Sequence, residues 1–149
     1  MTASHIPAAL RRDVRARAQG CCEYCRLGED DAFFPHEPDH VIAVKHGGST
    51  DSANLALACI ECNRHKGSDL ASIDPESGLI VALFNPRTDE WDDHFDARGG
   101  KIVPRTNVGR VTVTLLRMNG PARVEVRAEL AAQGRWPGTV ATDMRESKQ

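Results

Sequence analysis

Two C-x-x-C pairs constrain the fold of this 149-residue chain more than any other feature of its sequence. Cys22 and Cys25 form the first pair, Cys59 and Cys62 the second, and 33 residues separate the pairs. Thiolates at this spacing wrap a tetrahedral zinc ion, and two pairs make a closed structural site that does no chemistry itself. One such pair alone could be a redox pair or could arise by chance. Cys21 could also replace Cys22 as a zinc ligand, in a C-x-x-x-C arrangement. We predict one structural zinc ion held by the two C-x-x-C pairs.

The segment between the pairs predicts a β-hairpin. The apolar stretches "HVIAV" (40–44) and "NLALA" (54–58) are typical of strands, and the turn-rich "KHGGSTDSA" lies between them. Zinc would tie the chain before the first strand to the chain after the second, so that the strands pair. A helix starting near Cys62 would place Asn63 in its first turn, within reach of Asp39 and His40. An acid and a histidine at a strand edge are otherwise most often solvated polar surface.

The rest of the chain divides into a few expected elements. Helices are predicted over 7–20, 107–120 and 121–134, a strand over 78–84, and a short extended piece over 101–106. Helical character is also expected in the second half of 61–72. The last residues, from Pro137 on, have the composition of a tail.

Charge and composition limit the classes of function. The formal net charge is −2, yet 98–127 carries seven basic residues against the single acid Glu125. The segment 28–39, in contrast, contains aspartate and glutamate but no lysine or arginine. A basic face can bind phosphates while the total charge stays near neutral. No stretch is long and apolar enough to span a membrane, and the N-terminus lacks a signal-peptide core. We expect a cytoplasmic protein, in which cysteines are more often metal ligands or free thiols than disulfides.

The stretch "CEYC…DHVIAVKHGGSTDSANLALACIECNRHKG" resembles the HNH endonuclease family. Order, spacing and the "CN-x-x-KG" ending all match over about residues 21–70. A weaker resemblance, to a bacterial subgroup, runs through "LFNPRTDEWDDHF" and "TNVGRVTVTLLRMN" to about residue 130. Pro38 departs from the apolar residue usual in the family, but proline is tolerated at a strand's first position.

The resemblance implies a role for each candidate site residue. His40 would be the general base, because imidazole titrates near the working pH. Asp39 and Asn63 would bind a catalytic Mg²⁺ or Mn²⁺ through oxygen atoms, separately from the structural Zn²⁺. Asn54 would hold the loop after the first strand and orient His40, and the Gly47-Gly48 turn would let the chain fold back to it.

The implied fold is α+β. A zinc-stapled ββα-metal (His-Me finger) core at 21–70 would follow an N-terminal basic helix at 1–20. A C-terminal extension of a strand and helices at 71–136 would pack on the core, and 137–149 would be a flexible tail. The expected activity is metal-dependent hydrolysis of DNA with little sequence specificity, and the oligomeric state stays open. A catalytically lapsed nucleic-acid-binding module and a protein-interaction zinc domain are the alternatives.

Several basic residues are candidates for contacts with the DNA backbone. His46 would either contact phosphate or pack the loop, and Arg64, His65 and Lys66 would either face phosphate or form an exposed helix face. A basic surface could combine six arginines from the N-terminal and C-terminal parts of the chain, namely Arg11, Arg12, Arg15, Arg105, Arg110 and Arg117. Alternatively, these arginines could only solubilise two helix faces.

Overall fold

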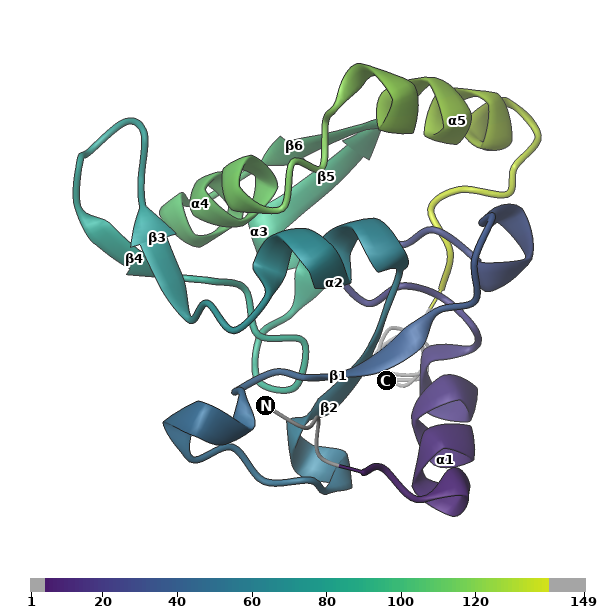
Figure 1. Ribbon diagram of the computed structural model, residues 1–149. Helices are drawn as coiled ribbons and strands as arrows, with labels where there is room; N and C mark the ends of the chain where they lie inside the picture. Colours follow the sequence, from purple (N-terminus) through teal and green to yellow (C-terminus); the bar gives the residue numbers. More distant parts are fainter. Residues whose placement is uncertain (1–4, 140–149) are drawn as a thin grey trace, which may run out of the picture.

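The computed structural model describes residues 5–139 and combines helices with short antiparallel hairpins (Figure 1). The helices of this part of the chain are α1 (Ala8–Ala18), α2 (Ile60–Lys66), α3 (Trp91–His94), α4 (Asn107–Leu115) and α5 (Pro121–Ala132). The strands are β1 (Glu37–His40), β2 (Leu55–Ala58), β3 (Ala71–Ile73), β4 (Ile80–Ala82), β5 (Phe95–Arg98) and β6 (Lys101–Pro104). None of the helices in 5–139 has the length and apolar composition that a membrane span requires. The predicted α+β class is confirmed.

The ββα unit at the centre consists of β1, β2 and α2. Strand β1 pairs antiparallel with β2, and His40 lies opposite Leu55 at the end of the ladder. The predicted strand over 40–44 was wrong, because β1 ends at His40. Beyond it the backbone groups of Ile42 bond the Asn54 side chain, and a 3₁₀ turn follows at Val44–His46. Asp39 and His40 therefore lie at the end of a strand rather than at its start.

Helix α2 begins directly after the second strand. Its N-cap is Cys59, whose sulfur accepts a hydrogen bond from the Cys62 amide, and its C-cap is Gly67 at φ 52°. The predicted helical second half of 61–72 is therefore wrong, because Gly67 adopts a positive φ that favours glycine and ends the helix early. Figure 1 shows α2 between the β1–β2 hairpin and the C-terminal elements.

The C-terminal elements agree in part with the sequence. Helices α4 and α5 and strands β4 and β6 lie within the predicted segments. Strands β3 and β5 and the short α3 were not predicted. Each of these strands is three or four residues long and is defined by its hairpin partner, β4 or β6, rather than by its own pattern.

One apolar core joins the first C-x-x-C to the C-terminal extension. Trp91 and Trp136 are both 4% exposed in it, and their indole N–H groups donate to the carbonyls of Tyr24 and Cys25 at 2.8 and 3.0 Å. Gly138, in the predicted tail, donates from its amide to the Arg26 carbonyl at 3.0 Å. Residues 140–149 of that segment lie outside the described residues.

Candidate metal centre and active site

Cys22, Cys25, Cys59 and Cys62 form a buried cluster whose sulfur atoms all lie within 4.8 Å of one another. The Cys25 and Cys59 sulfurs are 3.7 Å apart, far longer than a disulfide bond of about 2.0 Å. Four sulfurs at about 2.3 Å from a tetrahedral zinc ion are about 3.8 Å from one another. The cluster therefore has the ligand type and spacing of a structural zinc site, and Cys21 is not part of it.

Each pair of cysteines has the same local geometry. The Cys25 amide donates to the Cys22 sulfur at 3.5 Å, and the Cys62 amide donates to the Cys59 sulfur at 3.4 Å. Burial raises the thiol pKa of Cys22 and Cys62, while hydrogen bonds from the other thiols lower the pKa of Cys25. Thiolates packed this closely in the interior need a cation to balance their charge.

Arg123, on α5, supplies one positive charge to the cluster. Its guanidinium donates to the Cys62 sulfur at 3.0 Å and to the Cys59 sulfur at 3.8 Å. Although burial alone would lower the pKa of Arg123, the cysteine charges raise it. Nothing in the sequence marks this arginine, because it lies 61 residues after Cys62.

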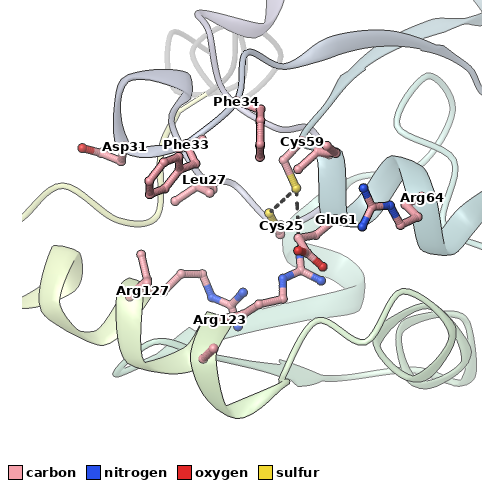
Figure 2. Close-up of a pocket in the computed structure, with 14 residues that line it drawn as sticks. Cys25, Leu27, Asp31, Phe33, Phe34, Cys59, Glu61, Arg64, Arg123 and Arg127 are labelled. Atoms are coloured by element: carbon pink, nitrogen blue, oxygen red, sulfur yellow. Dashed lines mark hydrogen bonds between the residues drawn. The ribbon is translucent and has the colours of Figure 1, made fainter.

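An apolar cavity of about 410 Å³ opens beside the cluster (Figure 2). Cys25, Cys59 and Arg123 line it together with Phe33 and Phe34, which are 100% and 56% exposed. None of the candidate catalytic side chains is among its lining residues, so this cavity is separate from the site described next.

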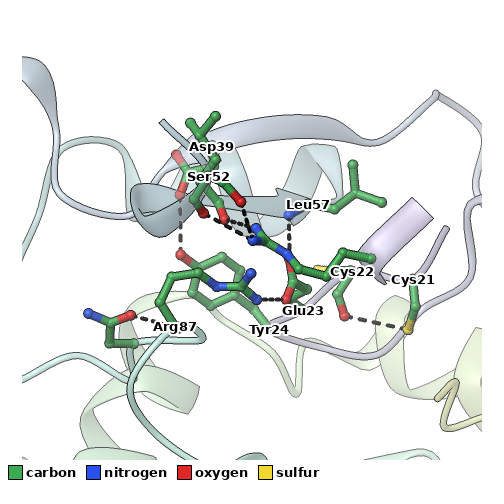
Figure 3. Close-up of polar contacts among 11 residues, drawn as sticks. Cys21, Cys22, Glu23, Tyr24, Asp39, Ser52, Leu57 and Arg87 are labelled. Carbon is green, nitrogen blue, oxygen red and sulfur yellow. Dashed lines mark hydrogen bonds and ion pairs between the residues drawn. The ribbon is translucent and has the colours of Figure 1, made fainter. Parts of the chain in front are cut away.

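Asp39 lies at the end of β1 and is 8% exposed. Its Oδ2 atom accepts a hydrogen bond from the Tyr24 hydroxyl at 3.2 Å (Figure 3) and forms an ion pair with the Lys66 ammonium at 3.1 Å. Burial raises the pKa of Asp39, and the Lys66 charge and the Tyr24 hydrogen bond partly offset that effect. The carboxylate is thus fixed by two donors that the sequence analysis did not assign to it.

His40, the next residue, is half-buried and contacts the loop that follows. Its Nε2 atom lies 2.8 Å from the Thr50 hydroxyl oxygen, and its carbonyl accepts from the Lys66 ammonium at 3.2 Å. If Nε2 carries the proton and donates it to Thr50, Nδ1 is left as a basic nitrogen. Thr50 was missed because an isolated threonine in a polar loop has no distinguishing pattern.

Asn54 joins the two ends of that loop. Its Oδ1 accepts from the Ile42 amide, and its Nδ2 donates to the carbonyls of Ile42 and Ser49, each at 2.9 Å. Gly48 lies so close that an added Cβ would be 1.7 Å from the Ile42 carbonyl oxygen and 2.8 Å from Asn54 Nδ2. Only glycine allows this approach. Through Ser49, Asn54 also holds the residue next to Thr50 and hence the surroundings of His40.

The remaining predicted ligand, Asn63, lies on α2 and is half-buried. Lys66 follows it by three residues, so the two share a helix face. That face points at the end of β1, because the Lys66 ammonium contacts both Asp39 and His40. Lys66 was predicted to face either phosphate or solvent, but it is 2% exposed and its charge is directed into the protein.

Several arginines predicted to bind DNA instead form ion pairs within the protein. Arg11 pairs with Glu37 at 3.1 Å and Arg15 pairs with Glu29 at 3.0 Å. Arg110 donates to both carboxylate oxygens of the buried Asp74 at 3.0 Å. These guanidiniums are already neutralised, which makes them weaker candidates for phosphate contacts than the sequence indicated.

The other candidate contacts stay at the surface. Arg12, Arg105 and Arg117 are exposed, as are His46 and Arg64. His65 is half-buried beside Glu61, 3.4 Å from its carboxylate, and the two are one helical turn apart.

Comparison with known proteins agrees with this geometry. Residues 22–69 match the family model of the HNH endonuclease. The Septu protein PtuA of Bacillus mycoides (strain KBAB4) is 30% identical over 152 residues, which cover 83% of this chain and 21% of that protein. The chain thus spans about a fifth of the length of this curated relative. No solved structure gives a significant match to the chain.

Proposed function

We propose, from the membership of residues 22–69 in the HNH endonuclease family, that this chain is a metal-dependent endonuclease that hydrolyses phosphodiester bonds in DNA. The observation that carries the proposal is the meeting of β1 and α2. Asp39 and His40 end the strand, and the α2 face that bears Asn63 packs against them through Lys66. A carboxylate, an imidazole and an amide are the groups that phosphodiester hydrolysis with one divalent ion requires, and β1 and α2 supply one of each.

His40 takes the role of general base in this proposal. It accepts a proton from the attacking water, and the Thr50 hydroxyl 2.8 Å from Nε2 orients the ring. Asn54 supports this arrangement because its side chain ties Ile42 to Ser49, the neighbour of Thr50. The strand therefore fixes the backbone of His40, and the loop fixes its ring.

Asp39 and Asn63 are the proposed protein ligands of a catalytic Mg²⁺ or Mn²⁺. Carboxylate and amide oxygens suit these hard ions, whereas the four cysteines suit zinc. When bound, the divalent ion would stabilise charge on the scissile phosphate and the leaving oxygen. Two protein ligands leave room for phosphate and water. The two metals thus have separate roles, one structural and one catalytic.

The proposed substrate is duplex DNA, read with little sequence specificity. Because Arg11, Arg15 and Arg110 already pair with carboxylates of the protein, the exposed Arg12, Arg105 and Arg117 are the better candidates for phosphate contacts. A chain with a formal net charge of −2 needs such a local positive surface to approach a polyanion. His46 and Arg64 are further candidates.

A plasmid-nicking assay with added Mg²⁺ or Mn²⁺ tests the proposal. The zinc-loaded protein should nick supercoiled plasmid, and His40→Ala should lower the rate by about 10²–10⁴-fold, the usual contribution of a general base. Zinc content, thermal unfolding and DNA binding should stay at the parental values. Lys45→Met, which changes an exposed residue of the same loop, is the matched control. If the His40→Ala protein nicks plasmid at the parental rate, His40 is not the general base.

A further inference from the structure

We infer that Tyr24 and Lys66 are positioning residues for Asp39, holding its Oδ2 atom so that Oδ1 alone is presented to a divalent ion. The inference rests on the proposed function, because it takes Asp39 as a ligand of the catalytic metal. It adds two residues to the site and specifies which oxygen binds.

The first argument is that the two oxygens of the Asp39 carboxylate have different contacts. Within residues 5–139, the Tyr24 hydroxyl at 3.2 Å and the Lys66 ammonium at 3.1 Å both contact Oδ2. Neither contact uses Oδ1. A carboxylate fixed by two donors on one oxygen has lost its freedom to rotate, and its other oxygen has a defined direction.

The second argument is the side from which the donors come. Tyr24 is 1% exposed and Lys66 is 2% exposed, so both reach Asp39 from the protein interior. Asp39 itself keeps 8% exposure. In the inferred arrangement a divalent ion would bind the Oδ1 side of the carboxylate, so Lys66 and the ion do not need to compete for one position.

The third argument is that each donor is itself fixed. Tyr24 lies between Cys22 and Cys25, its carbonyl accepts from the Trp91 indole at 2.8 Å, and its ring packs edge-on against Phe84. Lys66 has a second acceptor, the His40 carbonyl at 3.2 Å. Tyr24, which lies between two cysteines of the cluster, therefore links the structural site directly to the proposed catalytic ligand.

The test measures Mn²⁺ affinity of the zinc-loaded protein without DNA, by electron paramagnetic resonance of the free ion. Tyr24→Phe keeps the ring and removes only the hydroxyl, and Lys66→Met keeps an unbranched side chain and removes the ammonium group with its charge and its donors. Each should weaken Mn²⁺ binding by about 10–100-fold, the usual effect of losing a group that orients a metal ligand. The Mn²⁺ concentration for half-maximal nicking should rise by the same factor.

Controls separate this role from a merely structural one. Lys45→Met removes an exposed lysine nearby and should leave Mn²⁺ affinity unchanged. Zinc content and thermal unfolding show whether either variant is damaged, and the second variant keeps the inference testable if one fails to fold. Unchanged Mn²⁺ affinity in a folded variant would overturn the inference, as would tighter binding in Lys66→Met, which would make Lys66 a competitor of the metal.

Failure of the proposed function would give different results from failure of the inference about Tyr24 and Lys66. If the parent protein binds Mn²⁺ in an Asp39-dependent manner but cleaves no nucleic acid, the nuclease proposal is wrong and the affinities of the two variants still decide the inference. If Asp39→Ala binds Mn²⁺ as well as the parent does, Asp39 is not a ligand and the inference is wrong.

Discussion

Replacing Asn54 by alanine should destabilise the protein through the loop that it closes. The side chain makes three hydrogen bonds of 2.9 Å, to the amide and carbonyl of Ile42 and to the carbonyl of Ser49, and Asn54 is 9% exposed. At a net value of about 1 kcal/mol for each bond, the free energy of unfolding should fall by about 3 kcal/mol. For a chain of this size that corresponds to a decrease in Tm of about 6–12 °C.

The assay is thermal and urea unfolding of the zinc-loaded protein, followed by circular dichroism. Asn107→Ala is the matched control, because Asn107 is exposed and, within residues 5–139, its side chain accepts a hydrogen bond only from the neighbouring Val108 amide. We expect that control to change stability by no more than about 0.5 kcal/mol. Asn54→Asp should be at least as harmful as Asn54→Ala, since it would set a carboxylate against two carbonyl oxygens.

Plasmid nicking should fall together with stability in the Asn54 variants, because the loop also carries Thr50, the contact of His40. If Asn54→Ala lost nicking activity while its free energy of unfolding stayed within about 0.5 kcal/mol of the parent, the reasoning would be refuted. The role of Asn54 would then be direct contact with substrate or metal rather than support of the loop.

Two further changes test other parts of the molecule. Cys59→Ser, or chelation of the zinc, should unfold the core rather than only slow the proposed DNA cleavage, because structural zinc contributes about 10–16 kcal/mol of apparent binding energy to small domains. Zinc analysis with circular dichroism checks this, and a folded, zinc-free protein would contradict it. Arg110 lowers the pKa of Asp74 in the folded state, so this pair stabilises the protein above the unfolded pKa of about 4 and loses its effect only as the pH falls below that value. The loss of unfolding free energy in Asp74→Asn should therefore be constant from pH 8 to about pH 5 in urea titrations, whereas a loss that already shrinks between pH 6 and 5 would contradict the assigned pair.

The cysteine cluster and the ββα order could be predicted because their information is local. In a C-x-x-C the amide of the second cysteine can reach the sulfur of the first within four residues of chain, and both pairs have that geometry at 3.5 and 3.4 Å. The end of β1 could not be predicted, because the apolar alternation continues to Val44 while the Asn54 side chain takes over the hydrogen bonds of Ile42. A side chain ten or more residues away therefore overrides the local pattern.

The positions of charged residues in the sequence do not show which of them pair in the folded protein. Separate acidic and basic stretches predicted a free basic face. In the structure the acidic stretch folds onto α1, so that Glu29 binds Arg15 and Glu37 binds Arg11. The acidic stretch thus neutralises two α1 arginines that lie apart from it in the sequence, and the basic stretch 98–127 takes no part in these two pairs. Likewise, the burial of Lys66 depends on how α2 packs against β1, and a lysine near the end of a helix gives no sign of it.

The contact between Trp136 and Cys25 has a consequence for how the protein is made. The indole N–H reaches the Cys25 carbonyl across 111 residues of chain. A ribosome adds about 5–20 residues per second, so about 6–22 s pass between synthesis of the first cysteine pair and of the tryptophan that covers it. During that interval the thiols are newly made, lack their apolar cover and are open to oxidation, and early capture of zinc would protect them. A fragment cut at the limits of the family match, 22–69, would remain in this uncovered state permanently.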